Sequence, residues 1–268
     1  MPNPMPLDFC LLIPCYNNLE GLIQSLNSIA YEADKYQIVI VDDGSTIPIT
    51  IETIQPLLTK PLPLHIISYR PNKGITHALN TGLDWILQYT DSTYIARLDC
   101  SDICHPQRFY LQVQYLDQHP EVGLLGSWCR FQSADSKLQY SYQTPTQYAQ
   151  IKKAMYLRNV FIHPTVMFRT KMIDMTGPYP YDYPYAEDYA FFWKLLQQAE
   201  GVILSQYLVT CALNSAGISL TNRKAQLRSR QKVVNDFGTS HILKTVGILK
   251  LKLMRYIPYK LILKLKNS

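Results

Sequence analysis

The feature that most constrains the fold is an alternation of strand-like and helix-like segments through the first half of the chain. Short runs rich in Val, Ile and Leu predict strands at residues 9–13, 37–41, 64–68, 94–98 and 122–126. Apolar residues at helical spacing predict helices within residues 18–33 and 74–89, and Pro106 is expected to open a third in its tolerated first turn. This order is typical of an α/β fold with a mostly parallel sheet flanked by helices.

Polar and acidic side chains directly follow three of the predicted strands. Asn17 lies just after the first strand, Asp42 and Asp43 follow the second, and Asp99 and Asp102 follow the fourth. A single acidic turn usually has only a local role. Because ligands of open α/β sheets bind outside the carboxyl ends of the strands, several such turns at one edge predict a ligand site there.

The loops at these strand ends exclude two common nucleotide sites. No GxGxxG follows the first strand, which argues against a dinucleotide-binding fold, and no GxxxxGK[ST] P-loop is present. Aspartates are suited instead to accept hydrogen bonds from a base N–H or a ribose hydroxyl. The six cysteines form no CxxC pair, and Cys100, Cys104 and His105 lack a fourth ligand at the usual spacing, so we expect reduced thiols and no zinc site.

The second half of the chain is less regular. The elements expected there are a strand at residues 165–169, a Pro- and Tyr-rich loop at 175–185, a helix at 187–198 and one or two strands in 202–213. We find no internal repeat and no low-complexity tract in it.

Six linked motifs run through both halves in a fixed order. They are LLIPCYNN, IVIVDDGST, RPNKGITHALNTGL, YIARLDCSDICHPQRF, HPTVMFR and AEDYAFFWKLL, within residues 9–215. In this order and spacing they resemble the family 2 glycosyltransferases of the GT-A fold, and most of all the bacterial enzymes that build lipopolysaccharide, capsule or other cell-envelope glycans. Each motif alone is weakly specific, so the ordered combination carries the resemblance.

The resemblance implies a donor site at the predicted sheet edge. Pro14, Tyr16 and Asn17 would line the pocket for the nucleotide base, and Asp42 and Asp43 would hold the base and ribose. The other positions implied to border or bind the donor are Asn72, Lys73, Gly74, Asn80, Arg97 and Asp99.

The resemblance also implies that Asp188 is the catalytic general base, which takes the proton of the acceptor hydroxyl. A base within hydrogen-bond reach typically contributes about 10²–10⁴-fold. His163 and Glu187 would lie on the acceptor or diphosphate side. Local roles remain open: a structural histidine, and carboxylates that only stabilise a helix N-terminus or, at Asp42 and Asp43, close a turn.

A divalent cation, Mg²⁺ or Mn²⁺, is implied as the cofactor that neutralises the diphosphate. The family motif commonly reads Asp-Ala-Asp-Asp, with the metal ligand at its third position. Here it reads Asp99-Cys100-Ser101-Asp102, so Asp99 and Asp102 are the candidate metal ligands and Ser101 a poorer, neutral one. The donor phosphates would otherwise dominate metal binding, or turnover has been lost. Asp102 has a further alternative as the N-cap of the following helix.

Basic charge is concentrated at the end of the chain. Residues 222–268 carry 12 Lys/Arg and a single acidic residue, whereas residues 1–221 carry 14 Lys/Arg and 19 Asp/Glu. We therefore expect a catalytic domain at 1–221, with a donor half at about 1–130 and an acceptor half at about 131–221, and a basic helical tail at 222–268. One interpretation of the tail is an amphipathic helix on an anionic membrane, kinked at Pro258. The other is a pair of ordinary helices packed on the domain.

The expected function is inverting transfer of a sugar from a nucleoside-diphosphate donor, UDP-linked in the first instance, to a glycan or lipid-linked acceptor. The alternative is a catalytically degenerate protein that binds a nucleotide-sugar or a partner enzyme. No nucleic-acid recognition motif accompanies the basic charge. Because the sequence shows neither a signal-peptide pattern nor an apolar run of membrane-spanning length, we expect a cytoplasmic location, at the inner face of the cytoplasmic membrane.

Overall fold

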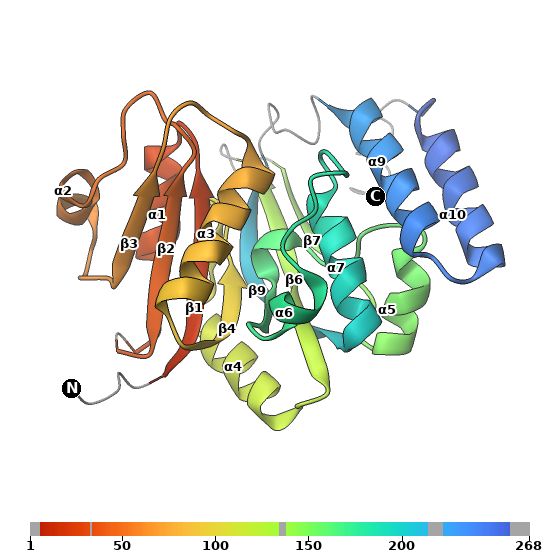
Figure 1. The fold of residues 1–268 in the computed structure, drawn as a ribbon. Helices are drawn as coiled ribbons and strands as arrows, with labels where there is room; N and C mark the ends of the chain where they lie inside the picture. The colour runs from red at the N-terminus through yellow and green to blue at the C-terminus, as the bar shows by residue number, and fades with distance from the viewer. Residues whose placement is uncertain (1–5, 33, 134–137, 214–221, 258–268) are drawn as a thin grey trace.

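The computed structural model describes residues 6–32, 34–133, 138–213 and 222–257. Within them one nine-stranded sheet runs through the molecule and is covered by helices on both faces (Figure 1). The strands are β1 (Leu7–Cys15), β2 (Tyr36–Asp42), β3 (Leu64–Ser68), β4 (Ser92–Arg97), β5 (Ile103–Cys104), β6 (Val122–Ser133), β7 (Gln139–Tyr142), β8 (Met167–Arg169) and β9 (Glu200–Leu213).

The strand order is β3-β2-β1-β4-β8-β6-β9-β5, with β7 paired to β6. β1 lies parallel between β2 and β4, and β3 continues this parallel half at the outer edge. β8 is antiparallel to both β4 and β6, while β6 and β9 form a long parallel pair. The loops that leave β1, β2 and β4 therefore meet at one edge of the sheet, as the sequence predicts.

Alternate residues of β1 belong to two separate hydrophobic cores. Phe9 and Leu11 pack with residues of α1 (Leu19–Asn27) and α4 (Arg108–Gln118) on one face. Cys10 and Leu12 pack on the other face, against α3 (Ile75–Tyr89) and the core that also includes α7 (Glu187–Gln198). Successive side chains of a strand point to opposite faces, so a strand buried on both sides reads as the continuous apolar run seen in β1. Shorter helices complete the layers: α2 (Ile51–Ile54), α5 (Tyr148–Met155), α6 (Met172–Thr176), and the 3₁₀ turns η1 (Gln55–Leu57) and η2 (His163–Thr165).

The α/β prediction is confirmed, with a mixed sheet, and three local predictions were wrong. Pro106 does not open a helix: α4 begins at Arg108, after a turn in which the Arg108 N–H bonds the His105 carbonyl at 2.9 Å. The strand expected at 165–169 is shortened to β8, since its first residues form η2 around Pro164. The loop expected at 175–185 begins inside α6.

Two C-terminal helices, α9 (Arg223–Phe237) and α10 (His241–Met254), pack at one end of the molecule (Figure 1). α9 contacts α7, and α10 contacts α9. The Tyr156 hydroxyl accepts the backbone N–H groups of Thr239 and Ser240, both at 3.0 Å, and so fixes the turn between the two helices. α10 approaches the end of α5 so closely that a Cβ on Gly247 would lie 2.1 Å from the Tyr156 carbonyl oxygen.

Residues 222–257 therefore contain two helices that pack on the rest of the protein. The predicted boundary at residue 221 and the predicted kink at Pro258 lie outside the described residues. No helix in the described part of the chain is long and apolar enough to span a lipid bilayer.

Candidate functional site

Asp42 ends β2, and its carboxylate closes the loop that follows. Its Oδ1 accepts the Ser45 N–H at 2.9 Å and its Oδ2 the Ile49 N–H at 3.1 Å. The side chain is 2% exposed. This is the local turn-closing role that short acidic side chains often take. A contact between Asp42 and the donor stays a prediction.

Asp43 holds a second loop in place. Its Oδ1 accepts the Lys73 N–H at 2.8 Å, and its Oδ2 accepts the Gly74 N–H and the Asn72 side-chain amide, both at 2.9 Å. The three residues of the predicted donor-bordering loop are thus brought onto the predicted donor aspartate. Their arrangement is set by Asp43, because a buried carboxylate is stable only when its oxygens are hydrogen-bonded.

The loop after β1 is locked to the loop after β2. The Asn17 N–H bonds the Ser45 hydroxyl at 2.8 Å, and the Asn17 side-chain oxygen accepts the Thr46 N–H at 2.8 Å. Tyr16, between Pro14 and Asn17, is 52% exposed. The structure therefore leaves an aromatic face open beside the joined loops, and aromatic faces stack readily on flat ligands.

Arg97 ends β4 and is wholly buried. Its guanidinium donates to the carbonyls of Leu12 and Leu98, to His163 Nε2 at 3.2 Å and to Asp99 Oδ1 at 2.6 Å. Arg97 has no exposed surface, and it positions Asp99, whose side chain is 42% exposed. A direct contact between Arg97 and the donor stays a prediction.

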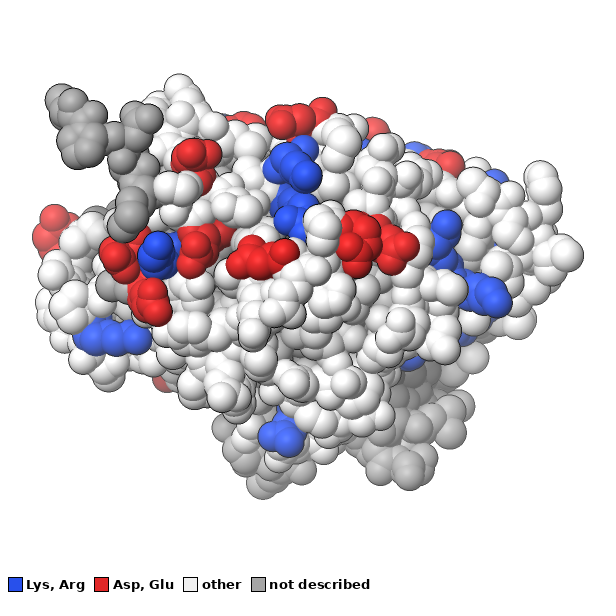
Figure 2. Space-filling model, turned by 90° about the horizontal axis from the view of Figure 1, so that it is seen from below, with Lys and Arg blue, Asp and Glu red and all other residues white. Residues whose placement is uncertain are grey.

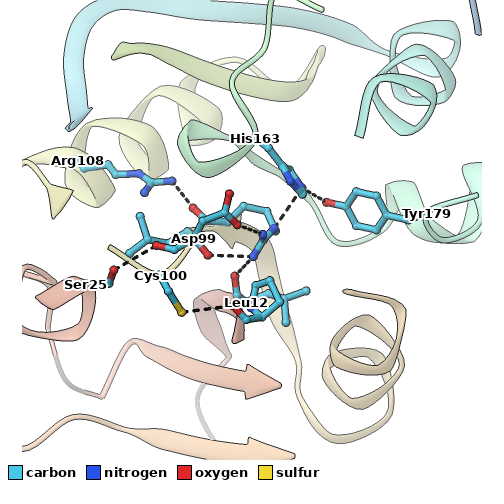
Figure 3. A network of polar contacts seen from close by, with 10 residues as sticks. Leu12, Ser25, Asp99, Cys100, Arg108, His163 and Tyr179 are labelled. Atoms are coloured by element: carbon cyan, nitrogen blue, oxygen red, sulfur yellow. Dashed lines mark hydrogen bonds and ion pairs between the residues drawn. The ribbon is translucent and has the colours of Figure 1, made fainter. Parts of the chain in front are cut away.

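His163 and Tyr179 extend this network away from Asp99 (Figure 3). The Tyr179 hydroxyl lies 2.9 Å from His163 Nε2, the atom that also accepts from Arg97. Burial, and then the positive charge of Arg97, hold the pKa of His163 well below its usual value. We therefore assign a neutral imidazole with its proton on Nδ1. His163 thus takes the structural role that the sequence left open.

Asn80 fastens the backbone of Tyr179 from the opposite side. Its side-chain amide donates to the Tyr179 carbonyl and accepts the Tyr179 N–H, both at 2.9 Å. Asn80 is 5% exposed. The predicted donor contact of Asn80 is replaced by this paired bond, which ties α3 to the loop between α6 and α7.

The turn after Asp99 faces the start of α1. Ser101 has a positive φ of 76°, which is uncommon for a non-glycine residue. Its hydroxyl accepts the Asn18 side-chain amide at 3.2 Å, and its N–H bonds the Gly21 carbonyl at 2.9 Å. A Cβ on Gly21 would lie 2.1 Å from the Ser101 Oγ, so only glycine leaves room for the turn.

Asp102 points into the protein. Its Oδ1 accepts the Ala212 N–H at 2.8 Å, so it fastens β9 to the turn. Burial, and then the negative charge of Asp99, raise the pKa of Asp102 well above its usual value. Capping of α4 by Asp102 does not occur, because the N-cap of that helix is Gln107.

These residues do not fit a divalent cation held by the protein alone. Among residues 6–32, 34–133, 138–213 and 222–257, no three His, Cys, Asp or Glu side chains are grouped as metal ligands. The Ser101 hydroxyl already accepts the Asn18 side-chain amide, and Asp102 turns its Oδ1 to the Ala212 N–H. Burial also disfavours the ionised form of Asp102, which is the form that metals bind. Asp99 is left as a single partly exposed carboxylate.

Asp188, in the first turn of α7, accepts two hydrogen bonds that favour its ionised form. Its Oδ2 accepts the Asn159 side-chain amide at 2.9 Å and its Oδ1 the Tyr189 N–H at 2.7 Å. Burial raises its pKa, and the positive charge of Arg230 acts in the opposite direction. A carboxylate is also favoured at a helix N-terminus.

Glu187, the residue before Asp188, favours its protonated form. Burial, and then the charge of Asp188, raise the pKa of Glu187 to about 8. Its Oε2 is buried and has no hydrogen-bond partner among the described residues. The pair therefore divides the two protonation states near neutral pH: Asp188 carries the charge more easily, and Glu187 retains its proton.

Sequence reasoning missed the groups that support this pair. Asn159 and Arg230 come from a loop and from α9, and no pattern in either segment signals a contact with α7. Tyr179 lay within the tyrosine-rich loop that was expected only as a loop. The negative charge of Asp99 also raises the pKa of Glu187 and Asp188, so strand-end and helix-start carboxylates share one electrostatic site.

The chain is similar to known proteins along most of its length. Residues 10–176 match the family described as glycosyl transferase family 2. An amylovoran biosynthesis glycosyltransferase of Erwinia amylovora is 32% identical over 196 residues, which are 70% of this chain and 69% of that protein. The UDP-Gal:alpha-D-GlcNAc-diphosphoundecaprenol beta-1,3-galactosyltransferase of Escherichia coli is 26% identical over 177 residues, 65% of this chain and 61% of the relative.

A solved structure has a similar fold. It is a mannosyltransferase of Pyrobaculum calidifontis in complex with GDP-Man and Mn²⁺. The TM-score is 0.64 at 17% sequence identity, over 93% of this chain and 70% of the other. At this identity the likeness concerns the arrangement of strands and helices, which is the GT-A fold.

Proposed function

Because this chain belongs to glycosyl transferase family 2, we propose that it transfers a sugar from a UDP-linked donor to a glycan or lipid-linked acceptor, with inversion, in the synthesis of a surface polysaccharide. Membership in the family means glycosyl transfer from a nucleotide-sugar. UDP and the lipid-linked acceptor are supported by the named substrate of the Escherichia coli relative. The observation that carries the proposal is the placement of two adjacent carboxyl groups, Glu187 and Asp188, in the first turn of α7, where the negative charge of Asp99 acts on both.

Asp188 is the general base of the proposed reaction. The acceptor oxygen forms a bond to the anomeric carbon as the bond from that carbon to the diphosphate oxygen breaks. The hydroxyl proton passes to Asp188, and the bonding electron pair leaves with the nucleoside diphosphate. The contacts from Asn159 and Tyr189 orient the base and favour its ionised form, against the burial that raises its pKa.

Glu187 is the hydrogen-bond donor of the pair. A carboxylic acid that stays protonated near neutral pH donates through its O–H, and its Oε2 has no partner among the described residues. A sugar hydroxyl or a diphosphate oxygen offers the acceptor atom that it lacks. The unpaired Oε2 supports the predicted position of Glu187 on the acceptor or diphosphate side.

The donor occupies the joined loops after β1 and β2 in this proposal. Tyr16 supplies an exposed ring for the base. Lys73, whose backbone is fixed by Asp43 and whose Nζ lies 5.2 Å from the Tyr69 ring centroid, supplies positive charge for the departing diphosphate. Positive charge placed where negative charge develops lowers the barrier to departure.

A divalent cation is not needed for any of these protein roles. A structural relative contains Mn²⁺. In this chain such a cation would have Asp99 and the donor diphosphate as its available partners, because Ser101 and Asp102 are engaged elsewhere. When bound, it would supply charge to the diphosphate.

The release of nucleoside diphosphate from a panel of UDP-, GDP- and dTDP-sugars tests this proposal. Each donor is offered with a glycan-diphosphoundecaprenol acceptor, with and without Mg²⁺ or Mn²⁺. We expect acceptor-dependent release from at least one UDP-sugar. Release from no donor in the panel would leave the second candidate, a nucleotide-sugar-binding protein without turnover, which the neutral Ser101 motivates.

A further inference from the structure

α10 carries apolar side chains on the side that is turned away from the protein. Its inner face holds Gly247 and Leu251, both buried. The exposed apolar residues, at spacings of four and three along the chain, are Ile242 (77% exposed), Val246 (48%), Leu249 (53%), Leu253 (65%) and Tyr256 (86%), which we call the α10 stripe. A surface helix of a soluble domain normally has polar residues there. The stripe is therefore a continuous apolar face with no partner in the described part of the chain.

The charges beside the stripe have one sign. α10 contains Lys244, Lys250 and Lys252 and no acidic residue. The segment 222–268 as a whole carries 12 Lys/Arg against Asp236 alone. Figure 2 shows acidic side chains along the left and centre of the lower face with basic ones among them, and basic side chains again at the right-hand end. The occupant of the stripe should therefore be apolar and carry negative charge.

A second copy of the chain fits these charges poorly. The stripe spacing is that of a coiled-coil seam, and in such a seam the flanking residues of the two helices face each other. Lys250 and Lys252 occupy flanking positions, and no acidic residue of α10 is present to pair with them. Self-association would bring like charges together, whereas an anionic lipid surface attracts them.

We propose that the α10 stripe binds an anionic lipid surface, with its apolar side chains in the interface and the flanking lysines on the lipid headgroups. Tyr256, at the end of the stripe, has the apolar ring and polar tip that are enriched at membrane interfaces. The helix lies along the membrane and does not cross it. This surface is independent of the proposed reaction.

The position of α9 relates the proposed lipid surface to Asp188 and Glu187 at the start of α7. α9 lies between α10 and α7, and its Arg230 acts on Asp188 at the start of α7. The acceptor half of the molecule is thereby the half nearest to the lipid surface. A lipid-linked acceptor would reach Asp188 from that side.

Flotation of the full chain with vesicles tests the proposal without any activity measurement. The vesicles are phosphatidylcholine alone, and phosphatidylcholine mixed with phosphatidylglycerol. We expect strong binding only to the mixed vesicles. Leu249→Gln with Leu253→Gln should lower the partition coefficient by about tenfold or more, and Lys252→Gln by about fivefold. Matched controls are Leu57→Gln, 52% exposed on η1, and the exposed Lys60→Gln, which should change nothing.

Other outcomes overturn the proposal. Equal binding to both vesicle types, no binding to either, or full binding by the double variant would each contradict it. A dimer in light scattering that Leu249→Gln with Leu253→Gln dissociates would assign the stripe to a second copy. Circular dichroism shows whether each variant remains folded, and we expect it to, because the changed side chains are exposed.

Discussion

Replacement of Glu187 by Gln tests the division of protonation states within the carboxylate pair. Glutamine keeps the shape of the protonated acid but cannot ionise. The pKa of Glu187 is about 8 in the folded protein and 4.5 ordinarily. At about 1.4 kcal/mol per pKa unit, this difference corresponds to a cost on the order of 5 kcal/mol for ionising the folded-state group.

The sign of the pH effect follows from proton binding. Between about pH 4.5 and about pH 8 the unfolded chain has lost the Glu187 proton and the folded chain has kept it. The stability of the wild type therefore has a component that is fully present below pH 4.5 and is lost as the pH rises through about 8. Glu187→Gln lacks this component. The unfolding free energy of the variant minus that of the wild type should therefore increase from about pH 4.5 to about pH 8 and stay constant above about pH 8.

Urea unfolding at several pH values across the window measures the difference. The exposed Glu121→Gln is the matched control and should show no such gain. Glu187→Gln should also retain sugar transfer within about tenfold of the wild type, because its amide N–H replaces the donated O–H. A difference in unfolding free energy that is constant with pH would refute the reasoning, and so would a loss of activity as large as that of a missing base.

Three further changes probe the groups that hold the site. Arg230→Gln should raise the pKa of Asp188 and move the acidic limb of the kcat/KM profile to higher pH, whereas the exposed Arg228→Gln on the same helix should leave the profile in place. Arg97→Lys should lower the free energy of unfolding by about 1–3 kcal/mol, because lysine cannot reach all the buried acceptors of the guanidinium; an unchanged urea midpoint would contradict this. Gly21→Ala should lower the free energy of unfolding by about 1–3 kcal/mol, because the added Cβ would crowd both Ser101 Oγ and the Asn18 side-chain amide; an unchanged urea midpoint would speak against the crowding.

The sheet and its ligand edge were predictable because they depend on local periodicity. A strand buried on both faces and a helix with one apolar side leave patterns that need no knowledge of the partner. The meeting of Asp43 and Asp99 at one edge followed from parallel topology alone. The shortening of β8 was not predictable from composition. Thr165 has a β-branched side chain that favours a strand, but it belongs to the 3₁₀ turn η2 that Pro164 helps to form.

The roles of individual side chains were less predictable, because they depend on distant partners. Arg97 matches a family position, but its burial results from contacts with Leu12 and His163 that only the packed sheet creates. Asn80 looks like a crevice residue on its helix, yet it bonds a backbone 99 residues away. Arg230 lay in the segment expected as a separate tail, and the packing of α9 on α7 brings its charge to the base.

The most direct test of the account is sugar transfer by Asp188→Asn. The variant keeps the size of the side chain but cannot take the acceptor proton, and only one of its two terminal atoms can still accept a hydrogen bond from Asn159 or Tyr189. If Asp188 is the general base, kcat should fall by about 10²–10⁴-fold while donor binding is retained, and the exposed Asp182→Asn should keep full activity. Transfer by Asp188→Asn at a rate close to that of the wild type would contradict the assignment of the base and, with it, the proposed mechanism.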